Sequence, residues 1–128
     1  MAAVHDIEIV NCIVARHVGG PDPFFAFDIL DVAPCFGGRL GVYVEIRARI
    51  FKTYRAKVEI RGPEHDLHWE GPVEEFEADR PLIQLAATPI DLGPRATGSF
   101  SVDILIDDIL MYSKGFTFEG EMDEEGEG

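Results

Sequence analysis

The chain has 128 residues and a mass of 14.2 kDa, which is the size of one domain. Hydrophobic residues make up 46% of it, so it is not disordered throughout, and no apolar run reaches the ~18 residues of a membrane-spanning helix. The net charge of −13 opposes binding to nucleic acid or to an anionic membrane surface. Because residues 1–6 lack the basic region of a signal peptide, we expect a cytoplasmic protein.

Apolar residues recur with a period of two, which is typical of β-strands. Residues 6–18 contain a continuous apolar run that suits a strand buried on both faces, and residues 24–32 form an aromatic-rich strand. The clearest alternation runs through residues 42–50 and 54–61. The turn Phe51-Lys52-Thr53 between these two strands is short, and it predicts an antiparallel hairpin.

The second half of the chain continues the pattern. Residues 68–76 and 81–87 predict short strands, and residues 100–107 alternate over their whole length. Residues 110–112 and 116–118 predict a closing hairpin. Between the strands lie turn signals such as Gly62-Pro63, Gly71-Pro72, Gly93-Pro94 and Thr97-Gly98.

The best helical candidate, residues 73–79, covers two turns at most. The sequence therefore predicts an all-β fold: a single antiparallel β-sandwich of about seven to nine strands, immunoglobulin-like or jelly-roll-like. We place the sandwich domain at residues 1–118. An acidic tail rich in glycine and glutamate, residues 119–128, follows it.

Two stretches of the chain resemble a known pattern. Residues 54–63 are followed by Leu67-His68-Trp69, and residues 97–108 are followed by Phe116-Thr117-Phe118. A strand ending in a turn, then a strand that begins Gly-x-Phe, then a final hairpin resembles a family of uncharacterised bacterial β-sandwich proteins, a domain of unknown function. The resemblance implies the sandwich fold; it implies no activity and no catalytic residues.

Two cysteines, Cys12 and Cys35, lie among apolar neighbours. In the cytoplasm both stay reduced, so the simplest expectation is that they belong to the core. A disulfide between them would require Cα atoms within about 7 Å of one another.

Basic residues are concentrated between positions 39 and 61, where seven of them face two acidic residues for a local charge of +5. On the expected hairpin, Arg47, Arg49, Arg55 and Lys57 share a polar face, and like charges side by side need neutralisation. Acids on a neighbouring strand, such as Glu70, Glu74 or Glu75, are one source. An acidic partner or the tail of a second copy is another, and a small anion or nucleic acid is a third.

A turn near the middle of the chain holds three possible metal ligands, His65, Asp66 and His68. Zinc would require further ligands from elsewhere, such as His5 or His17. A solvated turn beside an acidic strand is the simpler interpretation.

Aromatic residues offer a possible contact surface. Trp69 stands in a polar stretch, and Phe24, Phe25, Phe27 and Phe36 lie near two loops. Either the core takes them up, or Trp69 and some of the phenylalanines form an exposed anchor patch.

No nucleophile motif and no phosphate-binding loop stand out, so we expect no enzyme and no cofactor. The leading hypothesis is a binding or assembly module that acts through protein–protein contacts, with a protein partner or a second copy. Its expected binding residues are Arg47, Arg49, Arg55, Lys57 and Trp69. The alternative is a small metal- or ligand-binding domain with His65, Asp66 and His68 as ligands.

Overall fold

The structure is a computed structural model that describes residues 7–30, 35–36, 38–93 and 96–120, with the backbone alone for Cys35, Phe36 and Gly120. These residues form ten strands: β1 (Glu8–Gly19), β2 (Phe25–Ile29), β3 (Cys35–Phe36), β4 (Arg39–Arg47), β5 (Thr53–Arg61), β6 (Leu67–Glu70), β7 (Glu74–Glu77), β8 (Leu82–Asp91), β9 (Thr97–Ile106) and β10 (Ile109–Gly120).

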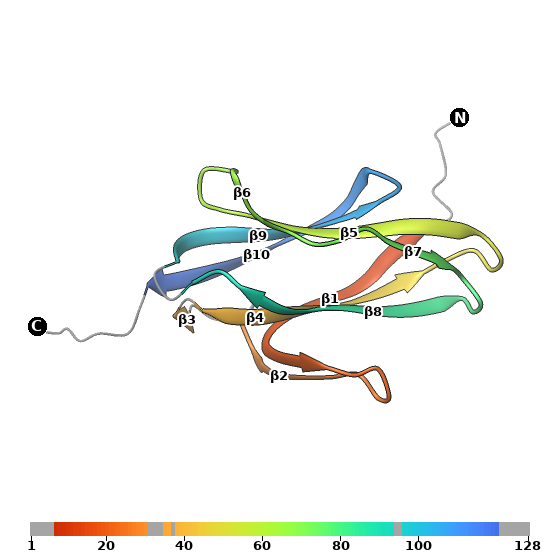
Figure 1. Cartoon of the computed structure of the whole chain (residues 1–128), viewed down its shortest axis with the longest axis horizontal. Helices are drawn as coiled ribbons and strands as arrows, with labels where there is room; N and C mark the ends of the chain where they lie inside the picture. Colours follow the sequence, from red (N-terminus) through yellow and green to blue (C-terminus); the bar gives the residue numbers. More distant parts are fainter. Residues whose placement is uncertain (1–6, 31–34, 37, 94–95, 121–128) are drawn as a thin grey trace, which may run out of the picture.

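The strands build two stacked sheets (Figure 1). One sheet has four strands in the order β2-β1-β4-β8, and the other has the order β3-β10-β9-β5-β6, with β7 also paired to β5. All pairs are antiparallel except that of the two-residue β3 with β10. The prediction of an all-β antiparallel sandwich is therefore confirmed.

The core lies between the sheets and follows from the alternation in the sequence. Inward residues of β4 and β5, among them Val42, Ile46 and Ile60, are completely buried. In the six-stranded sheet, Phe100 of β9 packs against Phe116 and Phe118 of β10, and the centroids of the three rings lie 5.3–5.8 Å apart. The burial of these faces is the main stabilising contribution to such a fold.

The hairpin predicted at Phe51-Lys52-Thr53 is wrong. β4 belongs to the four-stranded sheet and β5 to the six-stranded sheet, so this segment crosses from one layer to the other. Each of the two strands carries one apolar face. When the strands lie in different sheets, these two faces pack against each other and both are buried. In a hairpin the two apolar faces would lie side by side and would need another layer to cover them. The connection is tied down by Tyr54, whose hydroxyl accepts a hydrogen bond from the Arg49 backbone N at 3.1 Å.

The predicted closing hairpin of residues 110–112 and 116–118 is also wrong. Both segments belong to the single strand β10, and the actual hairpin joins β9 to β10. Its two-residue turn is Asp107-Asp108, and both residues have positive φ (53° and 66°), as a type I′ turn requires. Asp107 further accepts a hydrogen bond from the Arg55 backbone N at 3.0 Å, which fixes the turn against β5.

The predictions for the two cysteines and for the acidic tail fall partly outside the described residues. Cys12 is buried, as expected, but the Cys35 side chain lies outside the described part, and so does the proposed disulfide. The sequence predicts an acidic tail from residue 119, yet Glu119 pairs with Thr97 in the sheet, and residues 121–128 are not described. Among the residues 7–120 that are described, none forms a helix long and apolar enough to cross a membrane.

Candidate functional site

The basic residues predicted to share one face are divided between the two sheets. Arg47 ends β4, and its Nη1 lies 2.6 Å from Oε1 of Glu8 on β1. Arg55 and Lys57 lie on β5 in the other sheet, and Arg55 is directly opposite Glu75 of β7. Arg49 follows β4 in the connection to β5, outside any strand. The four residues do not form one basic face, because β4 and β5 belong to different sheets.

Lys57 belongs to a line of polar side chains on the outer face of the six-stranded sheet. Its Nζ lies 3.1 Å from Glu59 Oε2 and also contacts Oε2 of Glu70. Arg61 Nη2 lies 2.9 Å from Glu59 Oε1, and its Nε lies 3.6 Å from Asp103 Oδ2. We call Lys57, Glu59, Arg61, Glu70 and Asp103 the charged ladder. Neutralisation by an acid on a neighbouring strand, the first of the three sources considered above, therefore applies to Lys57.

The ladder contains buried charge. Glu59 and Asp103 are only 7% and 8% exposed. Burial raises the pKa of Glu59, but hydrogen bonds from Lys57 and Arg61, together with their positive charges, outweigh it, so the pKa lies below its usual value. The hydrogen bond to Glu70, followed by that to Glu59, raises the pKa of Lys57. Such satisfied, mutually bridging charges are typical of a structural element.

Of the three predicted metal ligands, His65, Asp66 and His68, two lie close together. His68 Nε2 lies 3.0 Å from Asp66 Oδ2, and the His68 ring packs edge-on against Phe100 with centroids 5.2 Å apart. His65 has a φ of 66° and an exposed side chain. Within the described parts of the chain, no three His, Cys, Asp or Glu side chains gather in a way that could hold a metal ion.

Trp69 lies on β6 directly opposite Ile60, a fully buried residue of β5. Opposite residues of an antiparallel pair share a face, so the indole points toward the other sheet. It is partly buried and stacks over Gly71, where an added Cβ would come within 2.8 Å of the ring. Trp69 is thus an inward residue at the edge of the core rather than an anchor on the outer face.

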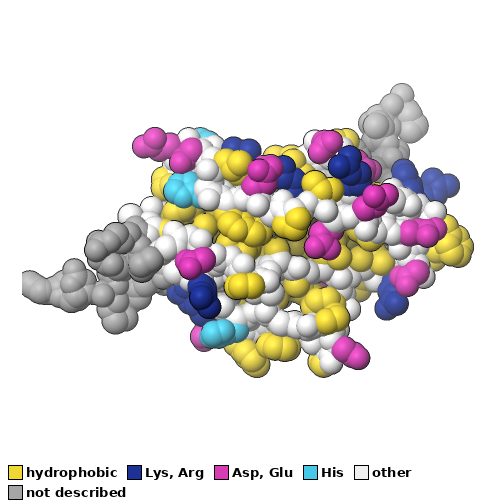
Figure 2. Space-filling view, in the orientation of Figure 1, with side chains coloured by type: hydrophobic (Ala, Val, Ile, Leu, Met, Phe, Trp, Pro, Cys, Tyr) yellow, Lys and Arg dark blue, Asp and Glu magenta, His cyan; other side chains and the backbone are white. Residues whose placement is uncertain are grey.

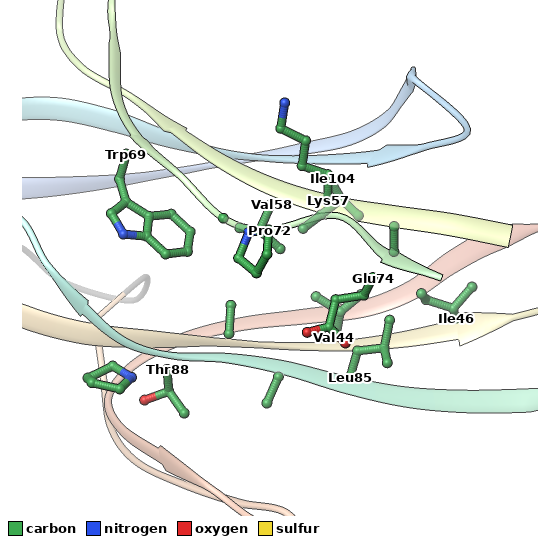
Figure 3. Close-up of a pocket in the computed structure, with 15 residues that line it drawn as sticks. Val44, Ile46, Lys57, Val58, Trp69, Pro72, Glu74, Leu85, Thr88 and Ile104 are labelled. Atoms are coloured by element: carbon green, nitrogen blue, oxygen red, sulfur yellow. The ribbon is translucent and has the colours of Figure 1, made fainter. Parts of the chain in front are cut away.

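Next to Trp69 the sandwich is open, and a cavity of about 280 Å³ enters between the two sheets (Figure 3). We call it the edge groove. One wall is β8, with Leu85 and Ala87 facing inward; the other consists of β6, β7 and the Gly71-Pro72 segment between them. Its floor is made of Val44, Ile46, Val58 and Ile104. A water molecule takes about 30 Å³ in the liquid, so the groove has several times the volume of one water molecule. That space is enough for several apolar side chains.

The open edge also appears in the burial pattern. On β4, the inward residues Val42, Val44 and Ile46 are at most 3% exposed. Their partners on β8, Ala87, Leu85 and Ile83, are only partly buried. In Figure 2, hydrophobic side chains are visible at the surface between the two layers. The inner face of β8 is therefore incompletely covered.

The charge at the groove is negative. Glu74 extends from β7 toward the opening, whereas the Lys57 amine points away from it (Figure 3). Glu75 and Glu77 follow on β7 opposite Arg55 and Thr53, so these two exposed side chains lie on the outer face of the sheet rather than in the groove. Where side chains are described, no ion pair involves Glu74 or Glu77.

A second apolar surface lies on β2, at the edge of the four-stranded sheet. Phe25, Phe27 and Ile29 alternate along the strand and are 47%, 60% and 36% exposed, and the two phenylalanine rings are 5.4 Å apart. Phe24 instead packs on Tyr43, with ring centroids 5.5 Å apart. The predicted aromatic patch thus exists in part, but without Trp69, and the Phe36 side chain lies outside the described residues.

The similarity of this chain to known proteins is weak. No protein-family model matches the chain, and no curated protein sequence matches it. Among solved structures, the chain is similar to an immunoglobulin-like protein from Pseudomonas aeruginosa, with 12% identity and a TM-score of 0.46. The match covers 92% of this chain and 100% of that one.

Sequence reasoning named Trp69 and Glu74 but missed the β8 side of the groove. Leu85 and Ala87 look like ordinary strand residues, and nothing in their identity marks an open edge. Two signals were present: Pro89 near the end of a strand, and the Gly71-Pro72 break between two strands of four residues. Proline in a strand and very short strands are both typical of sheet edges.

Proposed function

We propose that this protein is a non-catalytic binding module that engages a partner protein through the edge groove. The observation that carries the proposal is the open edge itself: a cavity of about 280 Å³, lined mainly by apolar side chains, at a place where the inner face of β8 is incompletely covered. Concave apolar surfaces with a few polar groups at the rim are typical binding sites. The strongly negative net charge favours a protein partner over nucleic acid or a membrane.

This proposal moves the binding site from the four basic residues to the groove. Arg47 and Lys57 are already paired with acids of this chain, on two different sheets. Of the five predicted binding residues, Trp69 remains as part of one wall of the groove, and Lys57 also lines the groove although its amine points away from it (Figure 3).

The test is a selection of peptides from a random display library on the purified protein. The selected peptides are then measured against Ala87→Phe, which fills the groove, and Leu85→Glu, which places a charge in it. Ser99→Phe adds the same aromatic ring at an exposed position outside the groove and serves as the matched control. Circular dichroism establishes that each variant is folded.

We expect peptides that bind the wild type and Ser99→Phe alike but lose affinity for both groove variants. The emission of Trp69, the one tryptophan of the chain, should change on binding. Peptides that bind Ala87→Phe and Leu85→Glu as well as the wild type would refute the groove as the binding site.

Self-association is a second candidate, and the aromatic surface on β2 favours it. Phe25, Phe27 and Ile29 are placed symmetrically about Phe27. An antiparallel copy of β2 would therefore put an apolar side chain opposite each of the three, as a two-fold interface requires. Native mass spectrometry at two ionic strengths separates a dimer from a monomer of 14.2 kDa.

A further inference from the structure

We infer that the occupant of the edge groove is an extended polypeptide strand that pairs with the free edge of β8, places alternate apolar side chains in the groove and carries lysine or arginine beside them. The inference rests on the proposed function and adds the conformation and the chemistry of the partner. It follows from three features: the backbone of β8, the shape of the cavity and the charge at its rim.

The backbone provides the first argument. β8 is an edge strand that pairs with β4 alone within the described part of the sheet. The edge of such a strand presents unpaired N–H and C=O groups that a further strand can use. Pro89 has no N–H, and the pairing of β8 with β4 is irregular near Ala87. The regular stretch that can accept a strand is therefore Leu82–Ala87.

The cavity provides the second argument. Side chains alternate along a strand, so one face of an added strand would point between the sheets. There it would cover Ile83, Leu85 and Ala87, the three inward residues of β8 that remain partly exposed. On the opposite wall, those side chains would meet Trp69 and Pro72 (Figure 3). A small apolar molecule could occupy the same space, but it would leave the free edge of β8 unpaired.

The rim provides the third argument and determines the sign of the partner's charge. Glu74 lies on β7 opposite Ala56, lines the groove and extends toward the opening (Figure 3). Opposite charges at a rim speed association, favour the right partner and fix register. A cationic side chain on the guest strand would lie next to this carboxylate. The chain's own residues 121–128 carry five acidic residues and have the wrong charge for this site.

The test uses synthetic peptides of alternating valine and threonine, flanked by lysine or by glutamate, with Trp69 emission as the readout. A peptide of the same composition but without alternation is the control for general hydrophobicity. We expect the lysine-flanked alternating peptide to bind about fivefold more tightly than the glutamate-flanked one, which is the effect that an exposed ion pair supports, and also more tightly than the peptide without alternation. Equal binding of the scrambled peptide would refute a strand in favour of any apolar ligand.

N-methylation tests the backbone pairing directly. Every second N–H of a strand points toward the same neighbour, so methyl groups on one alternate set should abolish binding to β8. Methyl groups on the other set should leave the affinity within about threefold, because those N–H groups face solvent. If the two sets behave alike, the guest does not pair with β8.

Charge reversal tests the rim. In Glu74→Lys, the preference for lysine flanks should be lost, because a cation replaces the carboxylate that lines the groove. Glu64→Lys makes the same change at an exposed position that does not line the groove, and it should keep the wild-type preference. An unchanged preference in the rim variant refutes the basic partner.

These outcomes separate the inference from the proposed function. Selected peptides that need the open groove but show neither alternation nor basic flanks would contradict the inference and leave the binding module intact. Peptides that bind the groove-filled Ala87→Phe variant as tightly as the wild type would contradict both.

Discussion

Replacing Arg61 by methionine should destabilise the fold by removing one positive charge that two buried carboxylates share. The guanidinium contacts Glu59 at 2.9 Å and Asp103 at 3.6 Å, and the side chains of these acids are only 10% and 12% exposed. Methionine keeps most of the apolar length of the side chain and removes its charge. The substitution therefore isolates the electrostatic part of the charged ladder.

Removing one partner of a buried ion pair costs about 3–5 kcal/mol. The cost is lower here because the Arg61 side chain is 36% exposed, Glu59 keeps Lys57, and Asp103 keeps a hydrogen bond from Ser113 Oγ at 2.7 Å. We expect a loss of about 2 kcal/mol in the free energy of unfolding at pH 7. For a domain of this size, that lowers Tm by about 8 °C.

The loss should depend on pH. The pKa of Glu59 is lower in the folded chain than in the unfolded one, so its stabilising contribution is present above the unfolded value, about 4.3, and disappears as the pH falls through the folded value. Arg61 supplies part of that lowering. The difference in Tm between wild type and Arg61→Met should be widest at neutral pH and narrow below about pH 4.

Thermal unfolding followed by circular dichroism measures both effects. The control is Arg80→Met. Among the described residues, the Arg80 guanidinium forms its ion pair and hydrogen bonds with the exposed neighbour Asp79 alone, so this change should leave Tm unchanged. Equal Tm values for Arg61→Met and wild type at pH 7 would refute the electrostatic role of the ladder. A difference of the same size at pH 3 would assign the effect to packing instead.

Three further substitutions test the fold and the two apolar surfaces. Gly41→Ala should cost about 1–3 kcal/mol in denaturant unfolding, because the new Cβ would come within 2.8–2.9 Å of branched side chains on β1 and β8; an unchanged midpoint would contradict this packing. Gly71→Ala should displace the Trp69 ring and shift its emission at nearly constant Tm, whereas an unchanged spectrum would mean that the indole does not stack there. Phe27→Ser should leave Tm unchanged, since Phe27 is 60% exposed, and should turn any dimer seen by native mass spectrometry into a monomer; a persistent dimer would exclude β2 as its interface.

The sequence predicted the strands well because alternation is a local signal. Residues 54–61 and 100–107 alternate so regularly that their inward faces could be assigned in advance, and β5 and β9 bear this out. Pairing is not local. The segment Phe51-Lys52-Thr53 is short enough for a hairpin and also for a crossing between layers, and only the need to cover two apolar faces decides between them.

The end of the chain shows the same limit. Ser113-Lys114-Gly115 has the composition of a turn, which led to the incorrect hairpin of residues 110–112 and 116–118. In the structure these three residues pair with residues 101–103 of β9, and Ser113 donates a hydrogen bond to Asp103. Ser113 lies opposite Asp103 on the outer face of the sheet, where a strand carries polar residues for the same reason as a turn, whereas Lys114 lies opposite the buried Val102.

Net charge along the sequence is an unreliable guide to charge on the surface of a sandwich. The +5 segment suggested an acidic partner, but its residues are divided between two sheets, where Arg47 pairs with Glu8 and Lys57 with Glu70, acids from distant parts of the chain. The carboxylate of Glu74 instead lies beside an apolar groove without an ion pair in the described structure. Because unpaired charge beside an apolar surface influences which partner is attracted, the partner that we propose is a basic strand rather than an acidic one.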